Sequence, residues 1–262
     1  IISKSSRITH FASPQKASAD YETGMIGGTA WFFSRDDMQE RLDYLFIDEA
    51  GQVSVANLVG MSRCADNLVL IGDQMQLQQP LQGTHPGESG FSLLDYYLND
   101  KAIIPLNHGV FLDITWRLHP GICDFISEYF YEGRLQPHPD NQNRSIDSPQ
   151  GEQFLIGKKA GIAFLPVEHS GNSRYSDEEV IVAKRAFEEL IGRASTDRVG
   201  KSDSPLAIED FLFIAPYNAQ VRRLRDALPV GARVGSVDKF QGQEAKVVIL
   251  SLSASYGEAR PR

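Results

Sequence analysis

Residues 45–51 are Leu45-Phe46-Ile47-Asp48-Glu49-Ala50-Gly51, in which three apolar residues are followed directly by two carboxylates and a glycine. In open α/β sheets the ligand binds beyond the carboxyl ends of the strands, so a buried strand here would deliver both acids to a binding crevice. Phosphoryl transfer needs one acid to hold Mg²⁺ and one group to orient or deprotonate a water, and Asp48 and Glu49 suit these tasks. Taken alone, the same residues fit a solvated acidic turn equally well.

A second apolar run ends in the same way. Residues 68–71 are followed by Gly72, Asp73 and then Gln76, whose side-chain amide has the groups to bind a terminal phosphate. A plain polar loop is the better interpretation of this stretch in isolation. Its separation of about twenty residues from the first run matches the next βα unit of one sheet, which favours a shared site.

Short apolar runs alternate with helical patterns along the chain, which predicts an α/β fold with mainly parallel sheets. Strands are predicted at residues 25–29, 45–47, 68–71, 162–167, 211–215, 233–237 and 247–252. Helices are predicted at residues 91–98, 122–130, 177–191 and 218–228, and loops at 82–90 and 136–151. The helix at 177–191 has the clearest signals, because Ser176 and Glu179 form a capping-box pattern and Gly192 follows its last turn.

Composition and charge narrow the class of protein. The chain has 262 residues, of which 42% are hydrophobic and 23% charged, as in a globular protein of one or two domains. The longest apolar run, residues 211–215, is far shorter than the roughly twenty residues of a membrane span. Two cysteines, Cys64 and Cys123, suit neither a disulfide framework nor a zinc site and favour a reducing, cytoplasmic or otherwise intracellular compartment. The net charge of −8 means that a polyanion must be bound in a local groove.

Four motifs follow one another over most of the chain. They are Asp48-Glu49-Ala50-Gly51, Gly72-Asp73-x-x-Gln76-Leu77 with Pro80, Trp116-Arg117-Leu118-His119-Pro120-x-Ile122, and Val237-Asp238-x-Phe240-Gln241-Gly242-Gln243-Glu244. In this order they resemble the motifs of superfamily 1 helicases, and most closely the 5′-to-3′ branch that contains the nonsense-mediated-decay helicase. The resemblance implies two RecA-like domains of the P-loop NTPase type, an incomplete first one at residues 1–106 and a second one at 107–262.

The resemblance also implies a role for individual residues. Asp48 would coordinate Mg²⁺ through water, and Glu49 would position or activate the attacking water. Gln76 would sense the γ-phosphate of ATP from the first domain, and Arg117 would reach it from the second, a task that suits a permanently charged guanidinium. The residues implied in nucleotide binding are Asp73, Gly242 and Glu244.

Single-stranded DNA or RNA is the polymer that the resemblance implies, in a channel across both domains. Backbone amides and small polar side chains make most contacts in this family, which explains how an acidic chain could bind a polyanion. The implied residues are Gly28, Thr29, Pro216, Tyr217, Gln220 and Ser236. Tyr217 could offer a stacking face for a base or pack in the core, and for Trp31 core packing is the favoured interpretation. The basic cluster Arg222, Arg223 and Arg225 is expected to be a solvated helix face.

These implications together predict an ATP-dependent helicase or translocase motor, which hydrolyses ATP in the cleft between two domains. A non-catalytic nucleic-acid-binding scaffold and the motor half of a helicase-nuclease stay open as alternatives. We expect a monomer.

The phosphate-binding loop G-x-x-x-x-G-K-[ST] and the family's final arginine motif are not found at their expected places, so we expect a fragment that is inactive by itself. Gly200-Lys201-Ser202 supplies only the last letters of the phosphate loop. A predicted helix precedes it and a predicted strand follows it, whereas a phosphate loop needs the reverse order.

Overall fold

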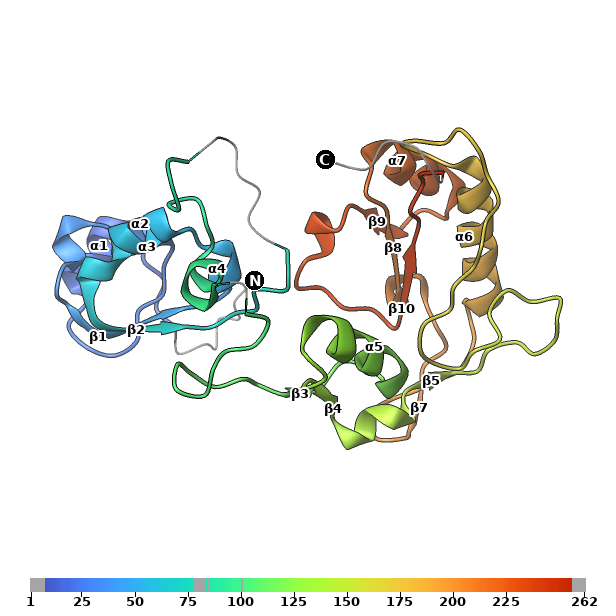
Figure 1. The fold of residues 1–262 in the computed structure, drawn as a ribbon, viewed down its shortest axis with the longest axis horizontal. Helices are drawn as coiled ribbons and strands as arrows, with labels where there is room; N and C mark the ends of the chain where they lie inside the picture. Colours follow the sequence, from blue (N-terminus) through green and yellow to red (C-terminus); the bar gives the residue numbers. More distant parts are fainter. Residues whose placement is uncertain (1–7, 78–82, 84, 100, 256–262) are drawn as a thin grey trace. The chain divides into compact units, whose positions relative to one another are not determined.

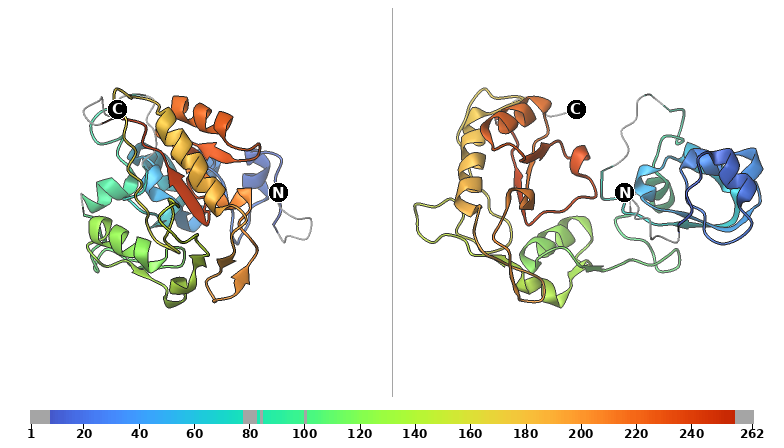
Figure 2. Two further views of the ribbon diagram at one scale, coloured as in Figure 1. Left: turned by 90° about the vertical axis from the view of Figure 1, so that its right-hand side faces the viewer. Right: turned by 180° about the vertical axis from the view of Figure 1, so that it is seen from behind.

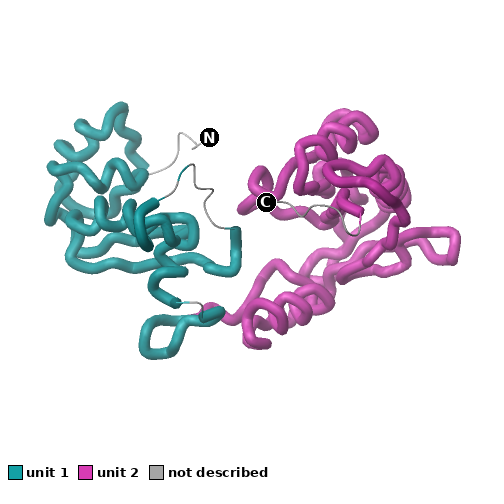
Figure 3. The backbone as a smooth tube through the Cα atoms, turned by 45° about the horizontal axis from the view of Figure 1, so that its top comes forward, with its two compact units in different colours: residues 1–110 teal, residues 111–262 magenta. Residues whose placement is uncertain are grey.

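Helices and strands alternate along the chain in this computed structural model, which describes residues 8–77, 83, 85–99 and 101–255 (Figures 1 and 2). The chain divides into two compact units, residues 1–110 and 111–262 (Figure 3). The main strand pairs of both units are parallel, which confirms the predicted α/β class with mainly parallel sheets. Among the described residues we find no helix with the length and apolar character that a membrane span requires.

The first unit is built around one parallel pair of strands. Its strands are β1 (Leu42–Ile47) and β2 (Ala65–Leu70), and its helices are α1 (Pro14–Asp20), α2 (Ala30–Phe33), α3 (Val55–Met61) and α4 (Leu93–Leu98). In the register of the pair Ile47 lies opposite Leu70, and α3 connects the two strands. The carboxyl ends of both strands therefore meet at one edge, as expected for the first two motifs.

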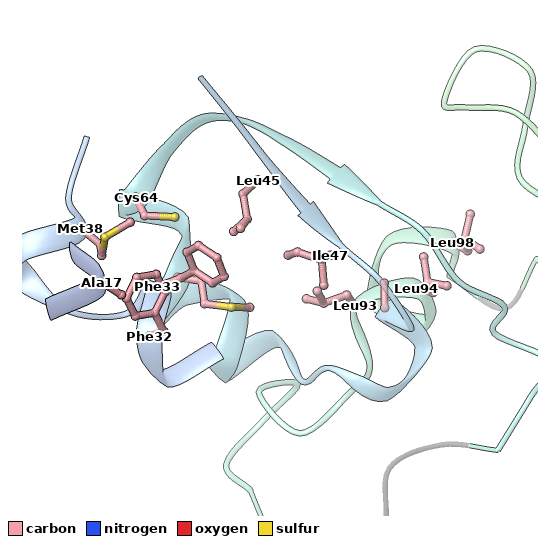
Figure 4. Packing of buried hydrophobic residues seen from close by; sticks show 12 residues of the cluster. Ala17, Phe32, Phe33, Met38, Leu45, Ile47, Cys64, Leu93, Leu94 and Leu98 are labelled. Atoms are coloured by element: carbon pink, nitrogen blue, oxygen red, sulfur yellow. The ribbon is translucent and has the colours of Figure 1, made fainter. Parts of the chain in front are cut away.

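Within the described part of this unit, helices cover one face of the strand pair. Leu45 and Ile47 are buried and point into a cluster with Phe33 and Leu93 (Figure 4). Phe46, between them, lies on the opposite face and is exposed. Alternation along β1 thus fixes which face packs on the helices, and it leaves the polar residues after Ile47 at the rim of the core.

The second unit has a three-stranded parallel sheet in the order β10, β8, β9. Its strands β8 (Phe211–Ile214), β9 (Arg233–Gly235) and β10 (Val247–Leu250) pack against α6 (Asp177–Leu190) and α7 (Asn218–Ala227), which lie side by side (Figure 2). The ring of Phe187 on α6 is 4.9 Å from that of Phe211. The remaining elements are helix α5 (Pro120–Phe130), the parallel pair β3 (Ile114–Thr115) and β4 (Gln136–Pro137), and the antiparallel set β5 (Ser145–Ile146), β6 (Ser195–Thr196) and β7 (Ser202–Asp203).

Four sequence-based predictions about the fold are wrong. Residues 136–151 are not a single loop, because they include β4, the 3₁₀ helix Pro139–Asn143 and β5. Residues 25–29 and 162–167 are not strands, since neither run pairs with a strand among the described residues, and Met25 and Phe164 are exposed. The side chain of Trp31 is 82% exposed and does not pack in the core, because its neighbours Phe32 and Phe33 occupy the inner face of α2. The other predicted strands and all four predicted helices are confirmed within a few residues. Pro80 of the second motif lies outside the described residues.

Candidate nucleotide and nucleic-acid sites

The acidic turn begins where β1 ends. Asp48 and Glu49 are both exposed, whereas the next residue, Ala50, is completely buried. Glu49 adopts the left-handed conformation with φ 52° and ψ 43°, and its N–H donates a hydrogen bond of 2.9 Å to Asp48 Oδ1. A non-glycine residue in this conformation is strained, and such strain is typical of functional sites. The turn thus holds two adjacent carboxylates at the rim of the core.

The first two motifs touch through their backbones. The N–H of Ala50 donates to the carbonyl of Ile71 at 2.9 Å, which ties the turn after β1 to the end of β2. A Cβ atom added to Gly51 would lie 2.7 Å from the carbonyl oxygen of Asp73, and one added to Gly72 would lie 2.8 Å from the Ala50 nitrogen. Both distances are too short for any side chain. The motif glycines therefore permit the contact that brings Asp48, Glu49 and Asp73 to one place.

Gly51→Ala should lower the free energy of unfolding of this unit by about 1–3 kcal/mol, because the added methyl group forces two backbones apart. Gly27→Ala is the matched control, since a Cβ atom there meets nothing within 4 Å and its backbone φ is not positive. Both substitutions change the entropy of the unfolded chain alike. Denaturant unfolding of the two variants measures the difference, and equal midpoints would contradict the close contact.

Asp73 holds the side chain of Gln76 in this structure. One Asp73 carboxylate oxygen accepts a hydrogen bond from the Met75 N–H at 3.0 Å, and the other accepts one from Gln76 Nε2 at 3.1 Å. The next residue, Gln74, donates to the carbonyl oxygens of Lys101 and Ala102, which anchors the loop to the chain after α4. The side chain of Gln76 is thus oriented by its own motif.

The chemistry of the acidic turn fits a magnesium ion bound through water. Mg²⁺ usually keeps several waters and takes one or two carboxylates from the protein. Asp48 is exposed, and one of its oxygens accepts the Glu49 N–H while the other has no hydrogen-bond partner within the described parts of the chain. The second carboxylate, Glu49, contacts only Gln52 Nε2 there, at 3.4 Å.

The third and fourth motifs are joined in the second unit by an ion pair. Arg117 Nε lies 3.0 Å from Glu244 Oε2, and the two side chains are 66% and 70% exposed. Such an exposed pair contributes only about 0–1 kcal/mol to folding. It therefore brings the two motifs together without committing the guanidinium to a structural role.

A buried asparagine that sequence reasoning missed, Asn141, holds the loop that carries Arg117. Asn141 is completely buried, and its side-chain nitrogen donates to the carbonyl oxygens of Thr115 and Leu118, each at 3.0 Å. The Thr115 hydroxyl accepts the backbone N–H of Arg117 at 3.3 Å. No local pattern marks Asn141, which stands in a polar stretch that suits a loop.

Glu244 reaches Arg117 because the chain turns at Gly242. This glycine has φ +73° and follows the short 3₁₀ helix Asp238–Phe240. The next residue, Gln243, accepts a hydrogen bond of 2.7 Å from Arg233 on β9. Gly242 and Glu244 therefore lie in a segment that is tied to the sheet, close to the Arg117 loop.

Two strand ends of the second unit present the residues expected to contact nucleic acid. Pro216 is exposed and Tyr217 half-buried after β8, and Ser236, also half-buried, follows β9. The Ala215 N–H donates to the Gly235 carbonyl at 3.1 Å, so these ends adjoin.

In the first unit, Gly28 and Thr29 lead into α2. A Cβ atom on Gly28 would lie 2.8 Å from the Phe32 ring, and the Thr29 carbonyl accepts the Phe32 N–H at 2.9 Å. The exposed ring of Trp31 stands beside them in the chain.

The structure places Gln220 differently from what the resemblance implies. Its side chain is 0% exposed, so it does not face a bound strand in this structure. Its oxygen accepts the Ser176 N–H at 2.9 Å, and its nitrogen donates to the Ser176 carbonyl at 3.0 Å. The predicted capping box is therefore only half formed: Ser176 Oγ accepts the Glu179 N–H at 3.1 Å, but Gln220 instead of Glu179 accepts the N–H of Ser176.

The segment Gly200-Lys201-Ser202 and the three arginines of α7 lie as the sequence indicates. Gly200 and Lys201 lie in the turn between β6 and β7, and Ser202 begins β7, so a strand follows directly where a phosphate loop needs a helix. On α7, Arg222 is exposed, Arg223 pairs with Asp177, and Arg225 donates to the Val234 carbonyl at 2.9 Å. A solvated helix face with internal partners explains this cluster.

Comparison with known proteins identifies the family. A family model described as an AAA domain matches residues 91–260. The chain is 28% identical over 232 residues to the DNA polymerase alpha-associated DNA helicase A of Schizosaccharomyces pombe, covering 85% of this chain and 34% of that protein. It is 29% identical over 227 residues to the probable helicase MAGATAMA 3 of Arabidopsis thaliana, covering 80% and 26%.

A third relative is the DNA replication ATP-dependent helicase/nuclease DNA2 of Gallus gallus, which is 24% identical over 224 residues, covering 82% of this chain and 20% of that protein. The chain thus spans about a third or less of the length of these relatives. The matched domain and the four ordered motifs agree, and the chain belongs to this AAA domain family and is a member of the superfamily 1 helicases related to the nonsense-mediated-decay helicase.

Proposed function

We propose that this chain is the motor part of an ATP-dependent helicase or translocase that moves along single-stranded DNA or RNA. The observation that carries the proposal is the pairing of motifs in space. Asp48 and Glu49 lie against the Gly72-Asp73 turn in one unit, and Arg117 contacts Glu244 in the other. Membership of a helicase family supports ATP as the nucleotide. We assign part of a first RecA-like domain to residues 1–106 and a second RecA-like domain to residues 107–262, close to the division into compact units.

The proposed chemistry uses groups that the two turns expose. Glu49 accepts a proton from the water whose oxygen bonds to the terminal phosphorus of ATP, while the bond from that phosphorus to the ADP oxygen breaks. Asp48 would hold Mg²⁺ through water, and that ion would supply positive charge at the phosphates. Gln76, oriented by Asp73, contacts the terminal phosphate. Arg117 leaves its exposed ion pair with Glu244 and stabilises the negative charge that develops on the phosphate during transfer. Asp73, Gly242 and Glu244 bind the nucleotide.

The proposed strand contacts combine backbone groups with two aromatic faces. In the second unit Pro216, Tyr217 and Ser236 lie at adjoining strand ends. In the first unit Gly28 and Thr29 adjoin Trp31, whose exposed ring offers a stacking face. Contacts of this kind neutralise few phosphates, which suits a chain with 26 basic and 34 acidic residues.

The full-length protein should hydrolyse ATP faster when single-stranded nucleic acid is present, and its strand affinity should depend weakly on salt. Each phosphate neutralised on a single strand contributes about −0.7 to the slope of log affinity against log salt, so we expect a slope of about −1 to −4. Titrations at several salt concentrations, beside a hydrolysis assay, measure both. Strand binding without any hydrolysis would instead indicate a non-catalytic scaffold.

A motor joined to a nuclease is the second candidate, because the relative from Gallus gallus is named a helicase/nuclease. Strand cleavage by the full-length protein that persists in Glu49→Gln, where ATP turnover is lost, would indicate a separate nuclease site.

A further inference from the structure

A network of buried polar side chains connects the carboxyl end of β10 to the first turns of α6 and α7. At its centre is Glu179, whose side chain is only 13% exposed. Its carboxylate accepts a hydrogen bond of 2.5 Å from the Ser251 hydroxyl and one of 3.0 Å from the Ser253 N–H. The His169 ring, 7% exposed, lies 3.1 Å from the same carboxylate through Nε2. Glu179 thus holds the chain directly after β10 against α6.

The network continues from Glu179 to α7 through a single hydroxyl. Ser251 Oγ donates to Glu179 and accepts a hydrogen bond of 2.8 Å from Gln220 Nε2. Gln220 in turn bonds both the N–H and the carbonyl of Ser176, which caps α6. Every link has a consistent donor and acceptor. A displacement of Glu179 would therefore be passed to Gln220 through Ser251.

The His169 side of the network is satisfied in the same way. Ser255 Oγ accepts the Asn172 N–H at 3.0 Å and lies 2.8 Å from His169 Nδ1. The arrangement is complete when the serine hydroxyl donates to Nδ1 and the ring donates from Nε2 to Glu179. The Glu179 carboxylate thus accepts from a hydroxyl, a backbone amide and an imidazole, so both of its buried oxygens have hydrogen-bond partners.

Tyr217 precedes Gln220 of this network by three residues. It is the cap residue of α7, and its carbonyl accepts the Val221 N–H at 3.0 Å, one residue after Gln220. The first turn of α7 therefore carries the half-buried Tyr217 at its start and the buried Gln220 on its inner side. Because Gln220 ties this turn to Ser176, it holds the backbone from which the tyrosine side chain projects.

We propose that Glu179 is a positioning residue for single-strand binding, which acts through Ser251 and Gln220 on Tyr217. The proposal rests on the strand binding of the proposed function. In it, the buried Gln220 supports the residue that binds the strand and does not contact the strand itself. Glu179 supports the stacking residue without touching the strand.

The same helix supplies a matched control. Glu189 is 9% exposed, accepts the Leu155 N–H at 2.8 Å and pairs with Arg185 at 3.1 Å, so its chemistry resembles that of Glu179. It lies ten residues further along α6, which is about 15 Å at the rise of an α-helix. Glu179→Gln and Glu189→Gln remove equivalent charges, but only the first lies in the network.

A double-mutant cycle in the full-length protein tests the proposal, with a fluorescent oligothymidylate strand as the probe and a melting curve for each variant. Tyr217→Ala should weaken binding by roughly 5- to 150-fold, the effect of losing one stacked base. Glu179→Gln should weaken binding by part of that factor, and it should cause little further loss when Tyr217 is already alanine. Glu189→Gln should lower the melting temperature by a similar amount without changing strand affinity in either background.

Ser251→Ala is the second variant, because it cuts the link to Gln220 while Glu179 keeps its contacts with Ser253 and His169. It should weaken strand binding as Glu179→Gln does. The proposal is overturned if Glu179→Gln weakens binding no more than Glu189→Gln does, or if its effect is undiminished without Tyr217. If the unmodified protein fails to bind the strand, the proposed function itself is wrong.

Discussion

Glu49→Gln in the full-length protein is expected to lower kcat for ATP hydrolysis by about 10²- to 10⁴-fold, the usual contribution of a general base. The amide has the shape of the carboxylate but cannot accept the proton of the attacking water. Nucleotide affinity should stay close to that of the unmodified protein, because Glu49 is assigned to the water and not to the phosphates. A hydrolysis assay beside a nucleotide-binding titration separates the two quantities.

Glu40→Gln is the control for this substitution. Glu40 is also exposed and also left-handed, with φ 55°, but it precedes β1 and so lies at the opposite end of the strand from Glu49. It should leave turnover unchanged. If Glu49→Gln hydrolyses ATP as fast as Glu40→Gln, the acidic turn is only a solvated turn.

Much of the fold could be predicted because its signals are local. Residues 45–47 and 211–215 are apolar runs of strand length, and the helix at Asp177–Leu190 has a continuous three- and four-residue spacing of buried side chains. The polar residues that follow β1 and β2 are placed by the rule for parallel sheets, and the structure brings Asp48 and Asp73 to the same edge. The roles of these residues in hydrolysis stay predictions.

The remaining features depend on contacts between distant parts of the chain. Phe164 and Met25 belong to runs that look like strands, yet a strand also needs a neighbour to pair with, which no local pattern supplies. The same limit applies to Gln220, whose burial depends on Ser176 and Ser251, and to the pair between Arg117 and Glu244. A motif shows which residues are close in sequence. The residues that they contact in the folded protein are distant in sequence, so a motif does not reveal them.

Arg117→Ala in the full-length protein should slow ATP hydrolysis by about 10³-fold or more, as the loss of an arginine that stabilises transferred phosphate does. The effect on nucleotide affinity should be smaller, because the charge on the phosphates grows during transfer. The melting temperature should hardly change, since the pair with Glu244 is exposed at both ends and contributes about 0–1 kcal/mol. A large loss of rate in a fully folded variant is therefore the expected signature.

Arg185→Ala separates this effect from the general cost of removing a surface arginine. Arg185 is also exposed and also forms an ion pair, 3.1 Å from Glu189, but it lies on α6 and belongs to none of the four motifs. Its variant should match the unmodified protein in hydrolysis rate. If the rate of Arg117→Ala instead falls only in proportion to its folded fraction, with a melting curve shifted to match, then Arg117 serves the second unit as a structural partner of Glu244 and another cation must reach the phosphate.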